Sequence, residues 1–122
     1  MHIGIIGSRR RDSAHDLSQV RSALVSVIVS GKEIAPTIVS GGCPKGGDRF
    51  AEILAKEFKL SIIIYRAEWR KYGKAAGFIR NTYIAEDSDV LIACVAEDRT
   101  GGTEDTIKKF KNLHPNNHLI LV

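Results

Sequence analysis

The chain has little of several features that would place it in a special class of protein. Its 122 residues include only two cysteines, Cys43 and Cys94, which cannot form the disulfide framework of a small secreted domain. No apolar run approaches the ~18 residues that a membrane-spanning helix needs. The N-terminal segment "MHIGIIG" lacks the basic region, long apolar region and small-residue cleavage site of a secretory signal. We therefore expect a cytoplasmic protein that does not contact membranes.

Aromatic side chains and metal ligands are also scarce. Aromatic residues make up 7% of the chain, which disfavours the stacking platforms of proteins that bind single-stranded nucleic acid. The four histidines show no ligand spacing with either cysteine, so we expect no metal and no cofactor. The formal charge of +4 favours anionic ligands in general. The length suits one domain over residues 1–122.

Apolar runs alternate with amphipathic segments along the whole chain. Apolar residues at steps of three and four predict helices, one of them over 75–86. Ser13 and Asp16 resemble a capping box at a helix start, and Gly31 is a suitable stop. In the last helix we expect Ile107, Phe110 and Leu113 to face the core. Predicted strands lie between the helices, over 3–6, 37–40, 61–65, 89–95 and 118–122.

Five apolar strands separated by helices predict a parallel sheet covered on both faces. Right-handed crossovers then give an α/β fold, a three-layer, doubly wound Rossmann-like domain with the five strands in the order 3-2-1-4-5. Such folds bind ligands at the carboxyl ends of their strands, near the point where the strand order reverses. The unusual motifs of this sequence all fall after predicted strands.

The first two motifs follow the first two strands. In "GSRRR" (7–11), Gly7 allows a tight turn, Ser8 offers a hydroxyl and Arg9 offers a planar set of donors for phosphate or carboxylate. The stretch "VSGGCPKGGD" (39–48) is a glycine-rich loop ahead of a helix, but Gly47-Asp48 replaces the Lys-Ser/Thr of a Walker A loop. The N–H groups and dipole of that helix favour an anion. Asp48 can either cap the helix or accept hydrogen bonds from a ribose.

The other two motifs lie in the second half of the chain. The stretch "GKAAGFIRN" (73–81) leads into a helix on which Gly77, Arg80, Asn81 and Ile84 share one face, which would serve a ligand or a dimer interface. The stretch "DRTGGTED" (98–105) brings glycines to a helix start, with Thr103 as the expected N-cap. Together the four motifs predict a site for a ligand that bears phosphate and ribose. The predicted ligand-binding residues are Gly7, Ser8, Arg9, Ser40, Gly41, Gly42, Gly47, Asp48, Gly77, Arg80, Asn81, Gly101, Gly102 and Thr103.

The same motifs resemble the SLOG superfamily, the Rossmann-like group that includes the lonely-guy phosphoribohydrolases and the DNA-processing protein DprA (Smf). The resemblance is closest to its YspA/YpsA-related branch and runs from "GSR" through "SGGCPKGGD" and "AAGFIRNTYIAEDSDVLIA" to "TGGTEDTI". Lonely-guy enzymes split the N-glycosidic bond of nucleoside 5′-monophosphates with an arginine and a glutamate. The resemblance implies catalytic roles for Arg80 and for Glu104 or Asp105, although "GGT" departs from the family's "PGGxGTxxE" loop. It also implies a homodimer.

Three functions are compatible with these residues. The first is binding of a nucleotide or nucleotide-derived ligand, as a sensor or binding module. The second is hydrolysis of the N-glycosidic bond in a nucleotide, with a carboxylate stabilising positive charge on the ribose. The third is binding of single-stranded nucleic acid, for which Trp69 and Tyr72 lie in a basic segment. We expect these two side chains instead to form a lid or wall that stacks on a base.

Overall fold

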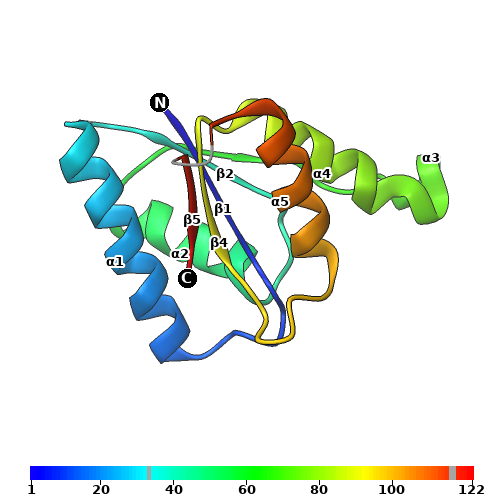
Figure 1. Cartoon of the computed structure of the whole chain (residues 1–122), viewed down its shortest axis with the longest axis horizontal. Helices are drawn as coiled ribbons and strands as arrows, with labels where there is room; N and C mark the ends of the chain where they lie inside the picture. Colours follow the sequence, from blue (N-terminus) through cyan, green and yellow to red (C-terminus); the bar gives the residue numbers. More distant parts are fainter. Residues whose placement is uncertain (33, 116–117) are drawn as a thin grey trace.

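The computed structural model describes residues 1–32, 34–115 and 118–122, and it has the architecture that the sequence predicts. Five parallel strands form one sheet in the order β3-β2-β1-β4-β5. Helices cover both faces of this sheet, which gives the three layers of a Rossmann-like α/β fold (Figure 1). The strands are β1 (His2–Gly7), β2 (Thr37–Ser40), β3 (Ile62–Ile64), β4 (Val90–Cys94) and β5 (Leu119–Leu121).

The helices divide into two pairs and a projecting segment. Helices α1 (Ala14–Gly31) and α2 (Gly47–Glu57) pack on one face of the sheet, while α4 (Ala76–Asp87) and α5 (Gly102–Leu113) pack on the other. The short helix α3 (Trp69–Tyr72) and a 3-10 turn (Gly73–Ala75) lead into α4. Figure 1 shows α3 at the end of the molecule farthest from α1.

Alternation along β1 separates the two hydrophobic cores. Ile3 and Ile5 pack with Leu24 of α1 and Phe50 of α2, whereas Ile6 packs with the buried residues of α4 and α5. This division follows from the two-residue period of a strand, which sends successive side chains to opposite faces. Because both faces are covered, the first and fourth strands can be apolar along nearly their whole length.

The predicted start of α1 is confirmed, and its predicted end is displaced. Ser13 and Asp16 form a capping box, in which each side chain accepts a hydrogen bond from the other residue's backbone N–H. Gly31 is the last helical residue and not the stop. Lys32 takes the left-handed conformation, with φ of 53°, and its N–H bonds to the carbonyls of Ile28 and Val29.

The expectation that Leu113 faces the core is wrong. Ile107 and Phe110 are buried, but Leu113 is 55% exposed. Steps of three residues fall short of a full turn of 3.6, so the third position in such a series has rotated off the buried face. His114 stacks on the ring of Phe110 instead, with 4.3 Å between the ring centroids.

No helix in the described part of the chain is both long enough and apolar enough to cross a bilayer.

Candidate functional site

A cavity of about 360 Å³ lies at the carboxyl ends of β1 and β4. These two strands pair side by side, with Gly7 opposite Cys94, and the strand order reverses between them. This is the position at which doubly wound folds bind their ligands. The walls come from the loops after β1, β2 and β4 and from helices α4 and α5. They comprise Ile6, Gly7, Ser8, Arg9, Arg10, Cys43, Asp48, Arg80, Asn81, Ile84, Thr100, Gly101, Gly102, Thr103 and Thr106.

The structure brings most, but not all, of the predicted ligand-binding residues to this cavity. Gly41 and Gly42 line a smaller neighbouring cavity of about 250 Å³. Ser40 is fully buried, and its Oγ accepts a hydrogen bond from the N–H of Gly42 at 3.2 Å. Gly47 and Gly77 line neither cavity. The predicted residues that line the larger cavity are Gly7, Ser8, Arg9, Asp48, Arg80, Asn81, Gly101, Gly102 and Thr103.

The start of α5 opens into the cavity and carries no side-chain cap. Thr103 was expected to be the N-cap, but the N-cap lies two residues earlier, at Gly101, and the helix begins at Gly102. Gly101 has φ of 107°, a conformation that L side chains rarely adopt, so the cap position excludes threonine. A Cβ on Gly102 would meet nothing within 4 Å. Because Gly101, Gly102 and Thr103 line the cavity and no side chain caps the helix, the start of α5 favours a negatively charged group there.

The start of α2 is closed, in contrast to the anion site that its glycine-rich loop suggests. Asp12 places Oδ1 2.7 Å from the N–H of Gly46 and 2.7 Å from Nε of Arg49. The hydrogen bond from Gly46 and the Arg49 guanidinium hold the pKa of Asp12 below its usual range. A carboxylate of the protein itself thus occupies the position that a ligand phosphate would take.

The glycines of "GGCPKGGD" serve close packing within the protein. A Cβ on Gly47 would lie 2.1 Å from the carbonyl carbon of Ile6, because α2 begins directly against β1. A Cβ on Gly46 would lie 2.4 Å from the carbonyl oxygen of Ser8, and the φ of Gly46 is 71°. These two positions are therefore explained by a difficult turn and not by room for a ligand.

Asp48 holds the loop after β2 and does not cap its helix. Its Oδ2 accepts a hydrogen bond from the N–H of Cys43 at 3.1 Å, and the helix has Gly46 as its N-cap without a side-chain hydrogen bond. Burial raises the pKa of Asp48, against the opposing effects of the Cys43 hydrogen bond and the charge of Arg80. Of the acidic residues that the structure describes, Asp48 alone lines the larger cavity.

Arg80 and Asn81 link α4 to both sides of the cavity. Arg80 donates from Nη1 to the carbonyl of Gly41 at 3.0 Å and from Nε to Oδ1 of Asn81 at 2.9 Å. Asn81 is buried and donates from Nδ2 to Oδ2 of Asp105 at 3.1 Å. The amide oxygen of Asn81 therefore orients Arg80, and its amide nitrogen holds α5 against α4.

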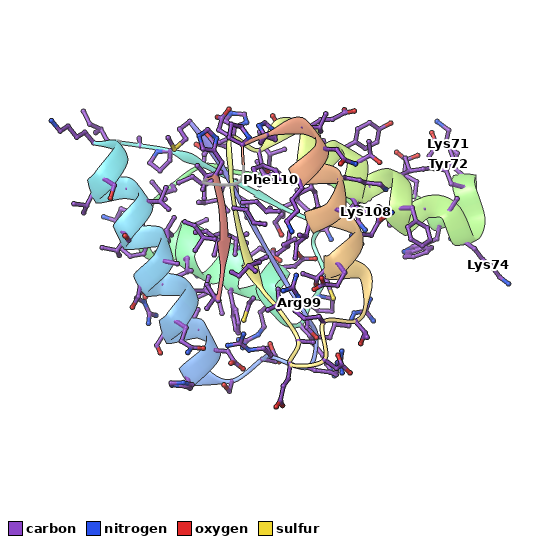
Figure 2. All side chains as sticks on the ribbon, viewed as in Figure 1. Lys71, Tyr72, Lys74, Arg99, Lys108 and Phe110 are labelled. Atoms are coloured by element: carbon purple, nitrogen blue, oxygen red, sulfur yellow. The ribbon has the colours of Figure 1, made fainter. Side chains whose placement is uncertain are left out.

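Neither carboxylate of the predicted catalytic pair lines the cavity. Glu104 forms a two-pronged ion pair with Arg99, at 2.9 Å for each contact. Asp105 accepts hydrogen bonds from Asn81 and from Nζ of Lys109, the latter at 2.9 Å. Both acidic groups are thus matched with cations or donors of the protein itself. Figure 2 shows Arg99 in the loop that leads into α5.

The three consecutive arginines after β1 have three different environments. Arg9 is exposed and has no hydrogen-bond or ion-pair partner within the described part of the chain. Arg10, which was not predicted as a site residue, reaches across the cavity rim to Asp98 with contacts of 2.9 and 2.8 Å. Arg11 turns inward to Asp16 and to the carbonyl oxygens of Val95 and Val122. The sequence gives no period that distinguishes these side chains, because they lie in a loop.

Trp69 and Tyr72 also differ in position. Trp69 lines the smaller cavity, together with Arg66 of the segment after β3. Tyr72 lines neither cavity and lies with Lys71 and Lys74 at the outer end of the molecule (Figure 2). Of these two side chains, only Trp69 therefore borders a cavity.

Comparison with known proteins finds no relative of this chain. No family model matches the chain, and no curated protein and no solved structure matches it.

Proposed function

We propose that the protein binds a nucleotide or nucleotide-derived ligand, one that bears phosphate and ribose, in the cavity at the ends of β1 and β4. The observation that carries this proposal is the meeting of two arginines with the open start of α5. Arg9 and Arg80 form no ion pair among the described residues, and they line the same cavity as the uncapped N-terminus that begins at Gly102.

The charge balance of the cavity supports an anionic group. Three arginines line it, and Asp98 neutralises one of them, Arg10. Among the residues that the structure describes, Asp48 is the only carboxylate in the lining, and its raised pKa disfavours its charged form. Helix N–H groups and guanidinium groups are the donors that proteins commonly offer to phosphate. The volume of about 360 Å³ lies within the range of small-molecule sites.

Binding is favoured over hydrolysis for a specific reason. The resemblance to lonely-guy enzymes assigns catalysis to Glu104 or Asp105, and both side chains have partners outside the cavity lining. A cleavage reaction would have to use Asp48, which is engaged by the N–H of Cys43. We therefore propose a sensor or binding module first and a phosphoribohydrolase second. Membership of the SLOG superfamily is part of the proposal, because its motifs border this cavity.

A calorimetric titration tests the proposal. The four nucleoside 5′-monophosphates are compared with the matching nucleosides, which lack the phosphate. We expect at least one nucleotide to bind, its nucleoside to bind much more weakly, and the affinity to fall as salt is added. Absence of binding by every nucleotide at millimolar concentration would overturn the proposal. Chromatography of the same mixtures for free base decides between binding and cleavage.

A homodimer is a separate proposal that rests on two exposed aromatic side chains of α4. Phe78 is 59% exposed and Tyr83 is 48% exposed, and aromatic side chains are enriched at interfaces between proteins. Light scattering distinguishes a dimer from a monomer of 13.4 kDa.

A further inference from the structure

A second cavity of about 250 Å³ adjoins the first and shares three residues with it. Arg9, Cys43 and Arg80 line both cavities and therefore mark the junction between them. The remaining walls of the second cavity come from the loop after β2 and from the segment between β3 and α3. They comprise Gly41, Gly42, Pro44, Arg66, Ala67 and Trp69.

Arginines that form no ion pair with a described residue gather at this second cavity. The chain has nine arginines, and five of them pair with acidic side chains in the part of the chain that the structure describes. The other four are Arg9, Arg66, Arg70 and Arg80, and all of these except Arg70 line the second cavity. No acidic side chain of the described residues lines it. Arg66 makes one long hydrogen bond, from Nη1 to the carbonyl of Gly42 at 3.4 Å. This concentration of positive charge exceeds what a single phosphate would need.

Trp69 supplies a flat apolar surface beside these arginines. Its side chain is 58% exposed, which is unusual for the largest apolar residue unless the surface is used. Gly77 of α4 lies behind the indole, since a Cβ on Gly77 would be 3.4 Å from Cη2 of Trp69. An exposed aromatic ring beside a cationic groove is the arrangement on which proteins stack a nucleic-acid base.

The junction relates the two cavities to one extended ligand. An anion at Arg9 and Arg80 touches both cavities, and the first cavity continues from there to the start of α5 at Gly102. On the other side, the second cavity continues to Arg66 and Trp69. A ligand that fills both must carry linked negative charges at its middle, with a planar group at one end and a further polar group at the other.

We propose that the ligand is a pyrophosphate-linked nucleotide conjugate, such as a nucleoside diphosphate sugar or a dinucleotide. Its base stacks on Trp69, its first phosphate lies at Arg66 and Arg80, and its second phosphate lies between Arg9 and the start of α5 at Gly102. The group attached to the second phosphate fills the rest of the larger cavity. This inference rests on the proposed nucleotide site and specifies its substrate class.

Titrations with matched probes test the inference. The probes are inorganic phosphate, pyrophosphate and two nucleotide series, AMP, ADP and ADP-ribose, and UMP, UDP and UDP-glucose. In at least one series we expect the diphosphate to bind about tenfold or more tightly than the monophosphate, since one further charge-assisted contact is worth that much. The conjugate should bind at least as tightly as the free diphosphate. Trp69 is the only tryptophan, so its fluorescence should change with nucleotides and not with pyrophosphate.

Two pairs of variants identify the groove. Trp69→Ala should lower affinity for the diphosphate nucleotide about tenfold, as expected for one stacked base, and leave pyrophosphate binding unchanged. Arg66→Ala should weaken both probes. The controls are Tyr72→Ala, which removes an exposed aromatic, and Arg70→Ala, which removes an arginine that pairs with no acidic side chain among the described residues. Neither residue lines a cavity. These controls should bind as the wild type does.

Some outcomes would overturn only the pyrophosphate-linked class of ligand, and one outcome would overturn the proposed nucleotide site as well. Equal affinity for monophosphate and conjugate, or unchanged diphosphate binding in Trp69→Ala, overturns the pyrophosphate-linked class and leaves a nucleotide site standing. A single-stranded oligonucleotide that binds more tightly than every conjugate, and loses affinity in Trp69→Ala, assigns the groove to nucleic acid instead. Absence of binding by every nucleotide overturns both proposals.

Discussion

Arg80 of α4 donates a hydrogen bond from Nη1 to the carbonyl oxygen of Gly41, 3.0 Å away in the loop after β2. The same loop is held from its other side by Asp48, which accepts from the N–H of Cys43. The loop is therefore fixed between two helices before any ligand arrives. Preorganisation of this kind reduces the ordering cost of binding. The hydrogen bond to Gly41 also places the Arg80 guanidinium at the junction of the two cavities.

Replacement of Arg80 should weaken binding more than it weakens the fold. We expect Arg80→Ala to lower nucleotide affinity about 10- to 100-fold, because hydrogen bonds to charged groups contribute roughly 1.5–3 kcal/mol. Arg80→Lys keeps the charge but loses the planar pair of donors, so it should recover only part of the affinity. Calorimetry measures both variants against Arg70→Ala, which removes an arginine outside the cavities. An equal loss in Arg70→Ala would show that net charge, and not the site, controls binding.

Substitution by alanine should have very different effects on stability at Gly47 and at Gly102. Gly47→Ala should lower the free energy of unfolding by about 3 kcal/mol or more, since the new Cβ would overlap the backbone of Ile6. Gly102→Ala should change it by less than about 0.5 kcal/mol, because the new Cβ enters open space. Gly102→Val should nevertheless impair ligand binding, since its side chain occupies the entrance to the α5 N–H groups. Urea unfolding and calorimetry separate these effects. Normal ligand binding by a folded Gly102→Val variant would contradict a ligand position at α5.

Asp48 should give the protein a distinctive pH dependence. Its pKa is raised in the folded state, chiefly by burial, so the folded protein binds this proton more tightly than the unfolded chain does. The contribution of Asp48 to the free energy of unfolding therefore falls as the pH rises from the ordinary carboxyl range through the raised pKa. Asp48→Asn does not titrate, so the variant should gain stability relative to the wild type over that rise.

The effect of Asp48 has to be measured as the difference in the free energy of unfolding between the wild type and Asp48→Asn. Asp12, Asp16, Glu57 and Asp98 have lowered pKa values, and they produce the opposite slope in both proteins. Unfolding curves collected across a pH series give the difference directly. Parallel stability profiles for the wild type and Asp48→Asn would show that Asp48 titrates normally.

Glu104→Gln and Asp105→Asn should leave ligand affinity nearly unchanged. Glu104 pairs with Arg99, and Asp105 accepts from Asn81 and Lys109, outside the cavity lining. Because the ion pairs are partly exposed, each substitution should cost less than about 1 kcal/mol of stability. If the protein releases base from any nucleotide, a loss of that release in Glu104→Gln with affinity retained would support the lonely-guy mechanism over a binding role.

The fold could be predicted because it depends on the periodicity of apolar residues. Some contacts in the site could not be predicted, because they join residues that lie far apart in the sequence. Five apolar runs separated by helical patterns gave the strand order that is observed. The sequence also marked Arg9, Arg80 and Gly102 by their positions after strands or at a helix face. It could not show that Asp12 fills the start of α2, since 34 residues separate Asp12 from Gly46.

Loop side chains were the hardest to predict. Arg10 and Arg11 are neighbours, yet one crosses the cavity rim to Asp98 and the other is tied to Val95 and Val122. Thr103 met the compositional rule for an N-cap, but the N-cap is Gly101, which has a positive φ, and the helix starts two residues earlier than expected. Such details follow from local backbone conformation, which residue type alone does not determine in a loop.

The most direct test of the account is a nuclear magnetic resonance titration of the isotopically labelled protein with a nucleotide. If phosphate meets the start of α5, the largest chemical-shift changes should occur at the backbone amides of Gly101, Gly102 and Thr103 and at the Arg80 side chain. Inorganic phosphate at higher concentration should shift the same α5 amides. Changes confined to the exposed lysines of α5, Lys108 and Lys111, with the Gly102 amide unmoved, would contradict it.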